Sequence, residues 1–301
     1  MRPAILPSRH RAALAAAALL TLALAACSPQ DDGDSSAASS PSGSASGTTA
    51  GACSPGGLAT RTAGKFTVGT DNPAYDPWFV DDKPSNGKGY ESAVAYAVAK
   101  QLGYTGDQVV WQKVPFNSAF SPGAKNFDVD INQVSITPER RKTVDFSPGY
   151  YDVRQAVVAP KGSKIAGARS LADLKNAKLG AQVGTTSLDV IDDLVKPTKQ
   201  PAVFQRNDLA VAALKNGQVD GIVVDLPTAF YVTGAQVPDA KVIGQFSTTG
   251  TTPEQFGMVL DKGSKLTPCV SQAVTALRKD GTLAALEKKW LSDAVNAPVL
   301  K

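Results

Sequence analysis

The sequence contains very little histidine and cysteine. Its single histidine is His10, and its three cysteines are Cys27, Cys53 and Cys269. Structural zinc sites need sets of Cys and His ligands, and catalytic triads need a histidine as general base. His10 also lies in an N-terminal segment that we expect to be removed. The composition therefore excludes ordinary zinc centres and Ser-His-Asp or Cys-His catalysis, and we expect neither a metal nor a cofactor.

The chain also lacks an apolar run long enough to span a membrane. Its main apolar run covers residues 12–26, about 15 residues where a spanning helix needs about 20. Arginines precede this run, and Leu24-Ala25-Ala26-Cys27 ends it. A basic start, a short apolar run and small residues at its end are typical of an export signal, here residues 1–26. We therefore expect the mature protein to lie outside the cytoplasm.

The end of this signal resembles the lipobox of bacterial lipoproteins. In a lipobox, small residues precede a cysteine that becomes the lipid-bearing first residue of the mature chain. The resemblance implies that Cys27 anchors the protein to the outer face of the cytoplasmic membrane. The alternative is an ordinary signal peptide followed by a chance cysteine.

Neither sign of charge predominates in the mature chain. The whole sequence carries a net charge of +4, but removal of Arg2, Arg9 and Arg11 leaves 28 basic residues against 27 acidic ones. A basic patch is the usual mark of nucleic-acid binding. We therefore expect no nucleic-acid partner.

Residues 27–64 are predicted to form a disordered tether. The stretch 35–51 consists almost entirely of Ser, Ala, Gly, Thr and Pro, which cannot bury enough apolar surface to fold. About 25 residues of this kind behave as a flexible coil with an r.m.s. span of about 25–30 Å. A folded domain that starts at Lys65 would then stand away from the membrane.

Cys53 and Cys269 are the cysteines that remain if Cys27 carries a lipid. Outside the cytoplasm, two remaining cysteines usually form a disulfide. We therefore predict a bond between them. The alternative is a pair of free thiols.

From Lys65 onwards, short β-rich runs alternate with helical patterns. Tyr90–Leu102 has Val94, Val98 and Leu102 on one face at helical spacing, which predicts a helix. Strands that alternate with helices are typical of α/β folds with parallel sheets. The pattern comes in two blocks, which predicts two lobes with a cleft between them.

Arg140 has the most unusual predicted position. Thr137 and Pro138 predict the start of a helix, with Thr137 as N-cap. Arg140 would lie in the first turn, where the macrodipole disfavours a cation but free N–H groups favour an anion. A carboxylate or phosphate ligand would resolve this conflict, because arginine binds such groups with two hydrogen bonds. The alternative is that Arg140, Arg141 and Lys142 form a solvated basic run.

These residues lie within an ordered set of motifs. Asn132-Gln133-Val134-Ser135-Ile136-Thr137-Pro138-Glu139-Arg140 is followed by Val144-Asp145-Phe146-Ser147-Pro148-Gly149-Tyr150-Tyr151. The pattern resembles the signature of polar amino-acid-binding proteins of ABC importers, family 3 of the bacterial extracellular solute-binding proteins. The resemblance covers about residues 65–291. Its other segments, in order, are Val68-Gly69-Thr70-Asp71, Tyr75-Asp76-Pro77-Trp78-Phe79, Gly89-Tyr90-Glu91 and Asp280-Gly281-Thr282 with Trp290.

The resemblance implies an α/β, two-lobed periplasmic-binding-protein fold (type II), with a ligand cleft between lobes joined by a two-segment hinge. Lobe 1 would comprise residues 65–159 and 253–301, and lobe 2 residues 160–252. The hinge would lie near Ala159 and Thr251–Gln255. The family also implies a monomer that captures a free amino acid and delivers it to the permease subunits of an ABC importer.

The resemblance assigns roles to the charged groups of the ligand. Arg140 would hold the α-carboxylate, helped by a backbone N–H and a hydroxyl near Ser135, and Asp225 would take the α-ammonium. The Gly184-Thr185-Thr186 turn matches a second carboxylate-binding element, and the match favours Thr186 as a ligand contact. Each has an ordinary alternative, because Thr185 and Thr186 can cap a helix and Asp225 can cap the helix that follows it.

Aromatic residues match positions whose rings cover the ligand side chain in the family. These are Phe116 and Tyr75, although core packing is the usual role of an aromatic residue. Trp78 lies beside Tyr75 in the sequence, and either role fits it.

The polar candidates concern the side chain of the ligand. Asp71 could meet a polar or cationic group, or it could brace its own loop. Asn132 and Gln133 stand where the family often has Gly or Ser, and amides can both donate and accept hydrogen bonds. They favour a ligand with a polar side chain, although they could instead satisfy backbone groups near the hinge.

An enzyme is the main alternative class. A few relatives on this fold are dehydratases of cyclic carboxylic acids, and Glu91, Asp128, Asp130 and Asp225 could supply a general acid. The missing histidine and the amino-acid signature argue against catalysis, so we expect a binding protein and no enzymatic activity. A ligand sensor is a further alternative, but no kinase domain or spanning helix accompanies the predicted lobes.

Overall fold

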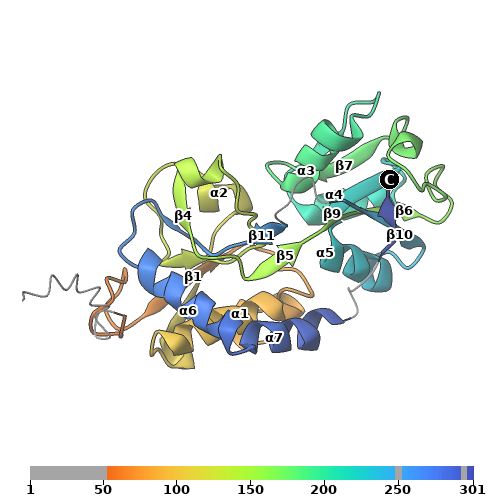
Figure 1. The fold of residues 1–301 in the computed structure, drawn as a ribbon. Helices are drawn as coiled ribbons and strands as arrows, with labels where there is room; N and C mark the ends of the chain where they lie inside the picture. Colours follow the sequence, from red (N-terminus) through yellow and green to blue (C-terminus); the bar gives the residue numbers. More distant parts are fainter. Residues whose placement is uncertain (1–52, 248–252, 293–296) are drawn as a thin grey trace, which may run out of the picture. The chain divides into compact units, whose positions relative to one another are not determined.

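The computed structural model describes residues 53–247, 253–292 and 297–301. The predicted signal peptide, the lipidation site Cys27 and the first part of the predicted tether lie outside the described residues, as does part of the second predicted hinge segment. The compact unit Thr48–Lys301 contains two α/β lobes (Figure 1).

The first lobe is built on a five-stranded mixed sheet of order β2-β1-β3-β12-β4. Strands β1, β2 and β3 run parallel, whereas β12 is antiparallel to both β3 and β4. Helices α1, α6 and α7 pack together on one side of the sheet, and α2 lies on the other (Figure 1). The strands are β1 (Phe66–Thr70), β2 (Val109–Lys113), β3 (Val129–Asp130), β4 (Val144–Phe146) and β12 (Val259–Asp261). The helices are α1 (Tyr90–Gln101), α2 (Phe116–Phe120), α6 (Thr267–Lys279) and α7 (Thr282–Leu291).

The second lobe is built on a six-stranded sheet of order β13-β10-β6-β9-β7-β8. Val157 and Val223 face one core, and Val158 and Ile222 face the other, as in sheets covered on both sides. The strands are β6 (Gln155–Pro160), β7 (Leu179–Gln182), β8 (Ala202–Phe204), β9 (Gly221–Asp225), β10 (Ala240–Phe246) and β13 (Val299–Leu300). The helices are α3 (Thr186–Asp189), continued by η6 (Val190–Val195), α4 (Asn207–Lys215), and α5 (Leu226–Tyr231), continued by η7 (Val232–Gln236).

A two-stranded ribbon lies between the lobes. In it, β5 (Tyr151–Val153) pairs antiparallel with β11 (Glu254–Phe256) (Figure 1). The predicted crossing near Ala159 was wrong, because β6 pairs with β9 and β10 of the second lobe along its length. The first crossing therefore lies at Arg154. A buried apolar run such as β6 needs neighbours on both sides, and only the second sheet supplies them.

The C-terminal residues also differ from the predicted lobe assignment. Val299–Leu300 forms β13, which pairs with β10 at the edge of the second sheet. Gln245 Nε2 donates to Ala297 O at 2.6 Å, and Leu300 is buried in a core of this lobe. Residues 297–301 therefore belong to lobe 2, although they were predicted to lie in lobe 1.

The helix predicted to begin at Thr137 is not formed. Only a single 3-10 turn, η4 (Arg140–Lys142), is present, although Thr137 Oγ1 accepts from Arg140 N at 3.2 Å as an N-cap would. Val144 and Phe146 of β4 are buried, so the chain has to extend again directly after this turn. The helix macrodipole therefore does not explain the position of Arg140.

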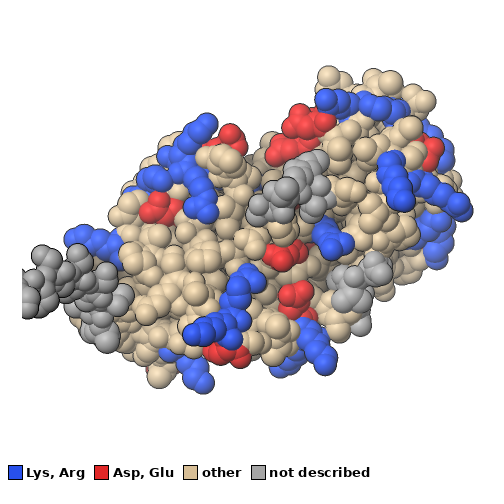
Figure 2. Space-filling model, viewed as in Figure 1, with Lys and Arg blue, Asp and Glu red and all other residues tan. Residues whose placement is uncertain are grey.

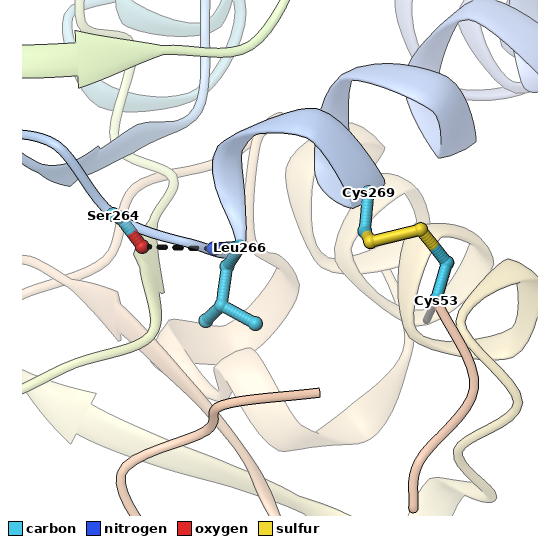
Figure 3. The surroundings of a disulfide bond; sticks show 4 residues. All are labelled: Cys53, Ser264, Leu266 and Cys269. Atoms are coloured by element: carbon cyan, nitrogen blue, oxygen red, sulfur yellow. Dashed lines mark hydrogen bonds between the residues drawn. A yellow bond between two sulfur atoms is a disulfide. The ribbon is translucent and has the colours of Figure 1, made fainter. Parts of the chain in front are cut away.

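The predicted disulfide between Cys53 and Cys269 is present, with the Cα atoms 5.3 Å apart. Cys269 lies in the first turn of α6, close behind Leu266, where Cys53 approaches it (Figure 3). Cys53 and Leu58 pack against the core of the first lobe. Residues 53–64 are thus joined to lobe 1, although the tether was predicted to extend to Gly64.

The surface carries both signs of charge. On the face shown in Figure 2, Lys and Arg side chains are interspersed with Asp and Glu over the two lobes. Within the described part of the chain, no helix is long and apolar enough to cross a membrane. The same residues contain no group of three or more His, Cys, Asp and Glu that could hold a metal ion.

Candidate functional site

A cavity lies between the lobes, beside the β5–β11 ribbon. Its volume is about 30 Å³, roughly twice what one water-sized sphere needs. Side chains therefore nearly fill it. All the residues predicted as ligand contacts line it. The lining residues are Asp71, Tyr75, Phe116, Asn132, Gln133, Ser135 and Arg140 from lobe 1, Phe256 from β11, and Gln155, Gln182, Thr185, Thr186, Ser187, Asn207, Val224 and Asp225 from lobe 2.

Arg140 is held between the two lobes. Its guanidinium donates from NH1 to Ser135 O at 2.6 Å and from NH2 to Gly184 O of the second lobe at 2.8 Å. The rings of Phe120 and Phe116 lie 4.3 and 5.7 Å from its Cζ. Burial lowers the pKa of Arg140 to about 10, so it remains a cation at neutral pH. It is therefore a buried positive charge in the cavity wall, and the solvated-run interpretation was wrong for this residue.

Asp225 provides a negative charge from the other lobe. It ends β9 and caps α5, accepting from Thr228 N at 2.9 Å and from Thr228 Oγ1 at 2.8 Å. Burial raises the pKa of Asp225 to about 6, although these hydrogen bonds act in the opposite direction. The predicted capping role is thus present, and the same carboxyl group lines the cavity.

Hydroxyl groups from both lobes meet at one side of the cavity. Ser135 Oγ and Thr186 Oγ1 lie 3.1 Å apart, and both bond to Glu254 Oε1. Thr185 Oγ1 instead accepts from Leu188 N at 3.2 Å and donates to Gln182 O at 2.7 Å. Thr185 is thus the N-cap of α3, and it is the hydroxyl of Thr186 that joins the cluster.

Gly184 sets the backbone of the turn that carries these threonines. Its φ is +73°, in the left-handed region that favours glycine, and an added Cβ would lie 2.3 Å from Asn117 Oδ1 of lobe 1. The turn can therefore approach lobe 1 this closely only without a side chain at this position. Because the turn lies this close to lobe 1, the carbonyl oxygen of Gly184 can accept a hydrogen bond from Arg140.

The aromatic candidates have different roles. Phe116 is buried and packs edge-on against Phe120, with centroids 5.2 Å apart, yet it also lines the cavity. Tyr75 donates from its hydroxyl to Asp208 Oδ1 of lobe 2 at 3.1 Å. Trp78 is fully buried in the core, and its Nε1 donates to Thr228 Oγ1 at 2.9 Å. Trp78 is therefore a core residue that also contacts the opposite lobe.

The two amides at the cavity wall are held differently. Gln133 has φ of 49° and donates from its backbone N to Glu91 Oε1 at 2.7 Å and from Nε2 to Glu91 Oε2. Glu91, which is fully buried in α1, also accepts from Tyr150 OH, and burial raises its pKa to about 7. Asn132 Nδ2 is buried without a hydrogen-bond partner among the described residues. The side chain of Asn132 thus has an unused hydrogen-bond donor, whereas Gln133 is held in place by its bonds to Glu91.

Asp71 lies in the loop after β1, where it lines the cavity and is partly exposed. It accepts a hydrogen bond from Asn72 N at 2.7 Å. Burial raises the pKa of Asp71, and the nearby positive charge of Arg206 partly opposes this. Both predicted roles, bracing the loop and presenting a carboxylate, are compatible with this geometry.

Several cavity residues were missed by the sequence analysis. Gln182 ends β7, which is followed by α3. The end of a strand before a helix is a position where α/β sheets commonly bind ligands, and the alternation of strands and helices in the sequence offered this signal. Gln155 lies opposite Asp225 in the β6–β9 pair, and its Oε1 accepts from Ser187 Oγ at 2.6 Å. Its position depends on the register of antiparallel strands far apart in the sequence. The missed residues are Gln155, Gln182, Ser187, Asn207, Val224 and Phe256.

Comparisons with known proteins agree on one family. The family profile "Bacterial extracellular solute-binding proteins, family 3" matches residues 66–293. The chain is 29% identical over 219 residues to a glutamine-binding protein of an ABC transporter from Bacillus subtilis (strain 168), covering 70% of this chain and 76% of that protein. It is 29% identical over 240 residues to an arginine-binding extracellular protein of the same organism, covering 76% of this chain and 86% of that protein.

Solved structures support the same fold. An ancestral arginine-binding protein bound to glutamine matches with a TM-score of 0.64 and 31% sequence identity. The match covers 76% of this chain and 98% of that one. The two-lobed α/β periplasmic-binding-protein fold predicted from the sequence is thus confirmed.

Proposed function

Because the chain belongs to family 3 of the bacterial extracellular solute-binding proteins, we propose that it captures a free amino acid for an ABC importer. One observation carries this proposal. Arg140 of lobe 1 and Asp225 of lobe 2 are buried charges of opposite sign that line a single cavity. A free amino acid is a zwitterion that can pair with both.

The two charges also link binding to closure. Each lobe supplies one partner for the zwitterion, so only the closed form makes both contacts. A ligand shifts an open–closed equilibrium by its differential affinity for the two forms. The permease subunits of the importer would then recognise the closed, loaded form. Because one chain supplies both lobes, we propose that the protein acts as a monomer.

The remaining cavity residues favour a ligand with a polar side chain, neutral or cationic. Asp71 presents a carboxylate, and Asn132 has a buried amide donor without a partner among the described residues. An acidic ligand side chain would meet Asp71 unfavourably. The proteins compared above are named for glutamine and arginine, which both fit this description.

A thermal-shift screen of the twenty amino acids and their common derivatives tests the proposal. Ligand binding stabilises the folded protein by RT ln(1 + [L]/Kd), about 4 kcal/mol at a thousandfold excess over Kd. We expect at least one polar amino acid to raise Tm clearly. A flat screen would contradict the proposal. Turnover of a cyclic carboxylic acid such as prephenate, which we do not expect, would favour the dehydratase alternative.

Binding should weaken in acid because Asp225 has to be ionised to attract the α-ammonium. With its pKa near 6 in the ligand-free protein, affinity should be constant above about pH 7 and fall up to tenfold per unit well below pH 6. Calorimetric titrations from pH 5 to 8 measure this. Asp225→Asn should bind weakly at every pH, and any slope that remains in this variant would report other buried acids such as Glu91 and Asp71, whose pKa values burial also raises.

We also propose that the protein is lipid-anchored through Cys27 to the outer face of the cytoplasmic membrane. Cys27→Ala should release it into the medium or the soluble fraction while leaving amino-acid affinity unchanged, because the predicted tether separates the anchor from the cavity. Membrane fractionation with a high-salt wash measures release. A variant that still sediments with membranes would contradict the lipoprotein assignment.

A further inference from the structure

Glu254 places a carboxylate of the protein itself against the hydroxyl cluster. It is the first residue of β11 and pairs with Val153 in the ribbon between the lobes. Its Oε1 accepts from Ser135 Oγ at 2.5 Å and from Thr186 Oγ1 at 2.6 Å, with Gln155 Nε2 at 3.4 Å. The donors come from both lobes, so this one oxygen bridges them.

Two of the donors used by Glu254, Ser135 and Thr186, are residues predicted to help hold the carboxylate of a ligand. A hydroxyl has only one proton to donate, so Ser135 and Thr186 cannot donate to Glu254 and to a ligand carboxylate at once. Two carboxylates at the same donors would also repel each other. The present arrangement therefore resembles a liganded site in which a protein side chain supplies the anion.

A second position is available to this side chain. Besides the hydroxyl cluster, Glu254 lines a neighbouring cavity of about 820 Å³, which is also lined by Arg154, Asp189 and Asp193. A carboxylate that leaves Ser135 and Thr186 can turn into this space, where the positive charge of Arg154 offsets the negative charges of the two aspartates. Displacement thus requires a change of rotamer and no unfolding of the ribbon.

We propose that Glu254 is an internal anion that holds the two lobes together without ligand and is displaced by the carboxylate of the ligand. The displacement by a ligand carboxylate rests on the proposed function. Only the ligand-free molecules in which Glu254 has left the hydroxyl cluster can then accept the ligand. The observed Kd equals the intrinsic Kd divided by the fraction of molecules in this form. Glu254 would in this way set the concentration at which the protein responds.

The first test needs no ligand. Hydrogen–deuterium exchange is measured on peptides covering residues 132–140 and 183–187 in the wild-type protein, Glu254→Gln, Glu254→Ala and the control Glu139→Gln. Glu139 is an exposed acid near the same turn, so its variant removes the same charge without touching the cluster. We expect exchange in both segments to be several-fold faster in Glu254→Ala than in the wild type and the control. Unchanged exchange would overturn the proposal whatever the ligand is.

The second test uses the amino acid found in the thermal-shift screen. Glu254→Gln should bind it at least threefold more tightly than the wild type or Glu139→Gln in calorimetric titrations, because no anion has to be displaced. Weaker binding would show that Glu254 supports the ligand and would overturn the displacement step. If no variant binds any amino acid, the proposed function fails, and the exchange measurement still decides whether Glu254 bridges the lobes.

Discussion

Arg140→Ala and Asp225→Ala are each expected to weaken amino-acid binding by about 2–5 kcal/mol, which is about 30-fold or more in Kd. Each substitution leaves one charge of the bound zwitterion without its partner inside a nearly filled cavity. Arg140 also loses its bond to Gly184 O across the lobes, so the closed form itself becomes less favourable. Isothermal titration with the amino acid identified by screening measures both losses.

The neighbouring residue provides a matched control. Arg141 carries the same charge, but its side chain is exposed, and its guanidinium lies 5.7 Å from the ring centroid of Phe146, outside the cavity lining. Arg141→Ala should therefore change Kd by less than about threefold, since exposed charges contribute little. Equal, small losses for Arg140, Arg141 and Asp225 would contradict the assigned carboxylate and ammonium sites.

The sequence predicted best those residues that lie in recognisable motifs or in regular apolar patterns. Arg140, Asp225 and Thr186 were assigned as ligand contacts through the family resemblance, and all three line the cavity. Asp225 ends β9 and Thr186 follows the neighbouring parallel strand β7, so these two lie at the same edge of one sheet, whereas Arg140 comes from the other lobe. The helix Tyr90–Leu102 was also predicted almost to the residue, because its apolar face repeats for three turns.

The errors in lobe assignment concern pairing between distant segments. β6 (Gln155–Pro160) is an almost fully buried strand, but its partners β9 and β10 lie far along the chain, so its lobe could not be assigned from local pattern. The residues of β13 were missed for the same reason. Glu254 was missed because its contacts form only where the two lobes and the ribbon meet, and a single glutamate at the start of a short strand carries no local signal.

One argument for a ligand at Arg140 does not hold. The predicted helix would have made a cation at its start unfavourable without an anion, but the structure has only a 3-10 turn there. What holds the guanidinium instead is a pair of backbone carbonyls, one from each lobe, and two phenyl rings. The family resemblance was the better basis for assigning Arg140 as a ligand contact, because it depends on the order of motifs along the chain and not on local helix geometry.

Loss of the Cys53–Cys269 disulfide should lower the free energy of unfolding by about 2–4 kcal/mol, through the larger conformational freedom of the unfolded chain. The bond joins residues 216 positions apart, so reduction releases most of the folded part of the chain from a closed loop. For a protein of this size the loss corresponds to a decrease in Tm of about 4–16 °C.

Cys53→Ala tests this expectation better than substitution of Cys269, because Cys269 is buried in α6 and its substitution would add the effect of a cavity. Thermal unfolding is compared with and without reductant for the wild type and the variant. Reductant should lower Tm of the wild type to that of Cys53→Ala and leave the variant unchanged. Because neither cysteine is among the residues that line the cavity, amino-acid affinity at 25 °C should be retained. A wild-type Tm that does not respond to reductant would mean that the bond adds nothing to the core that already packs Cys53 and Leu58 against the first lobe.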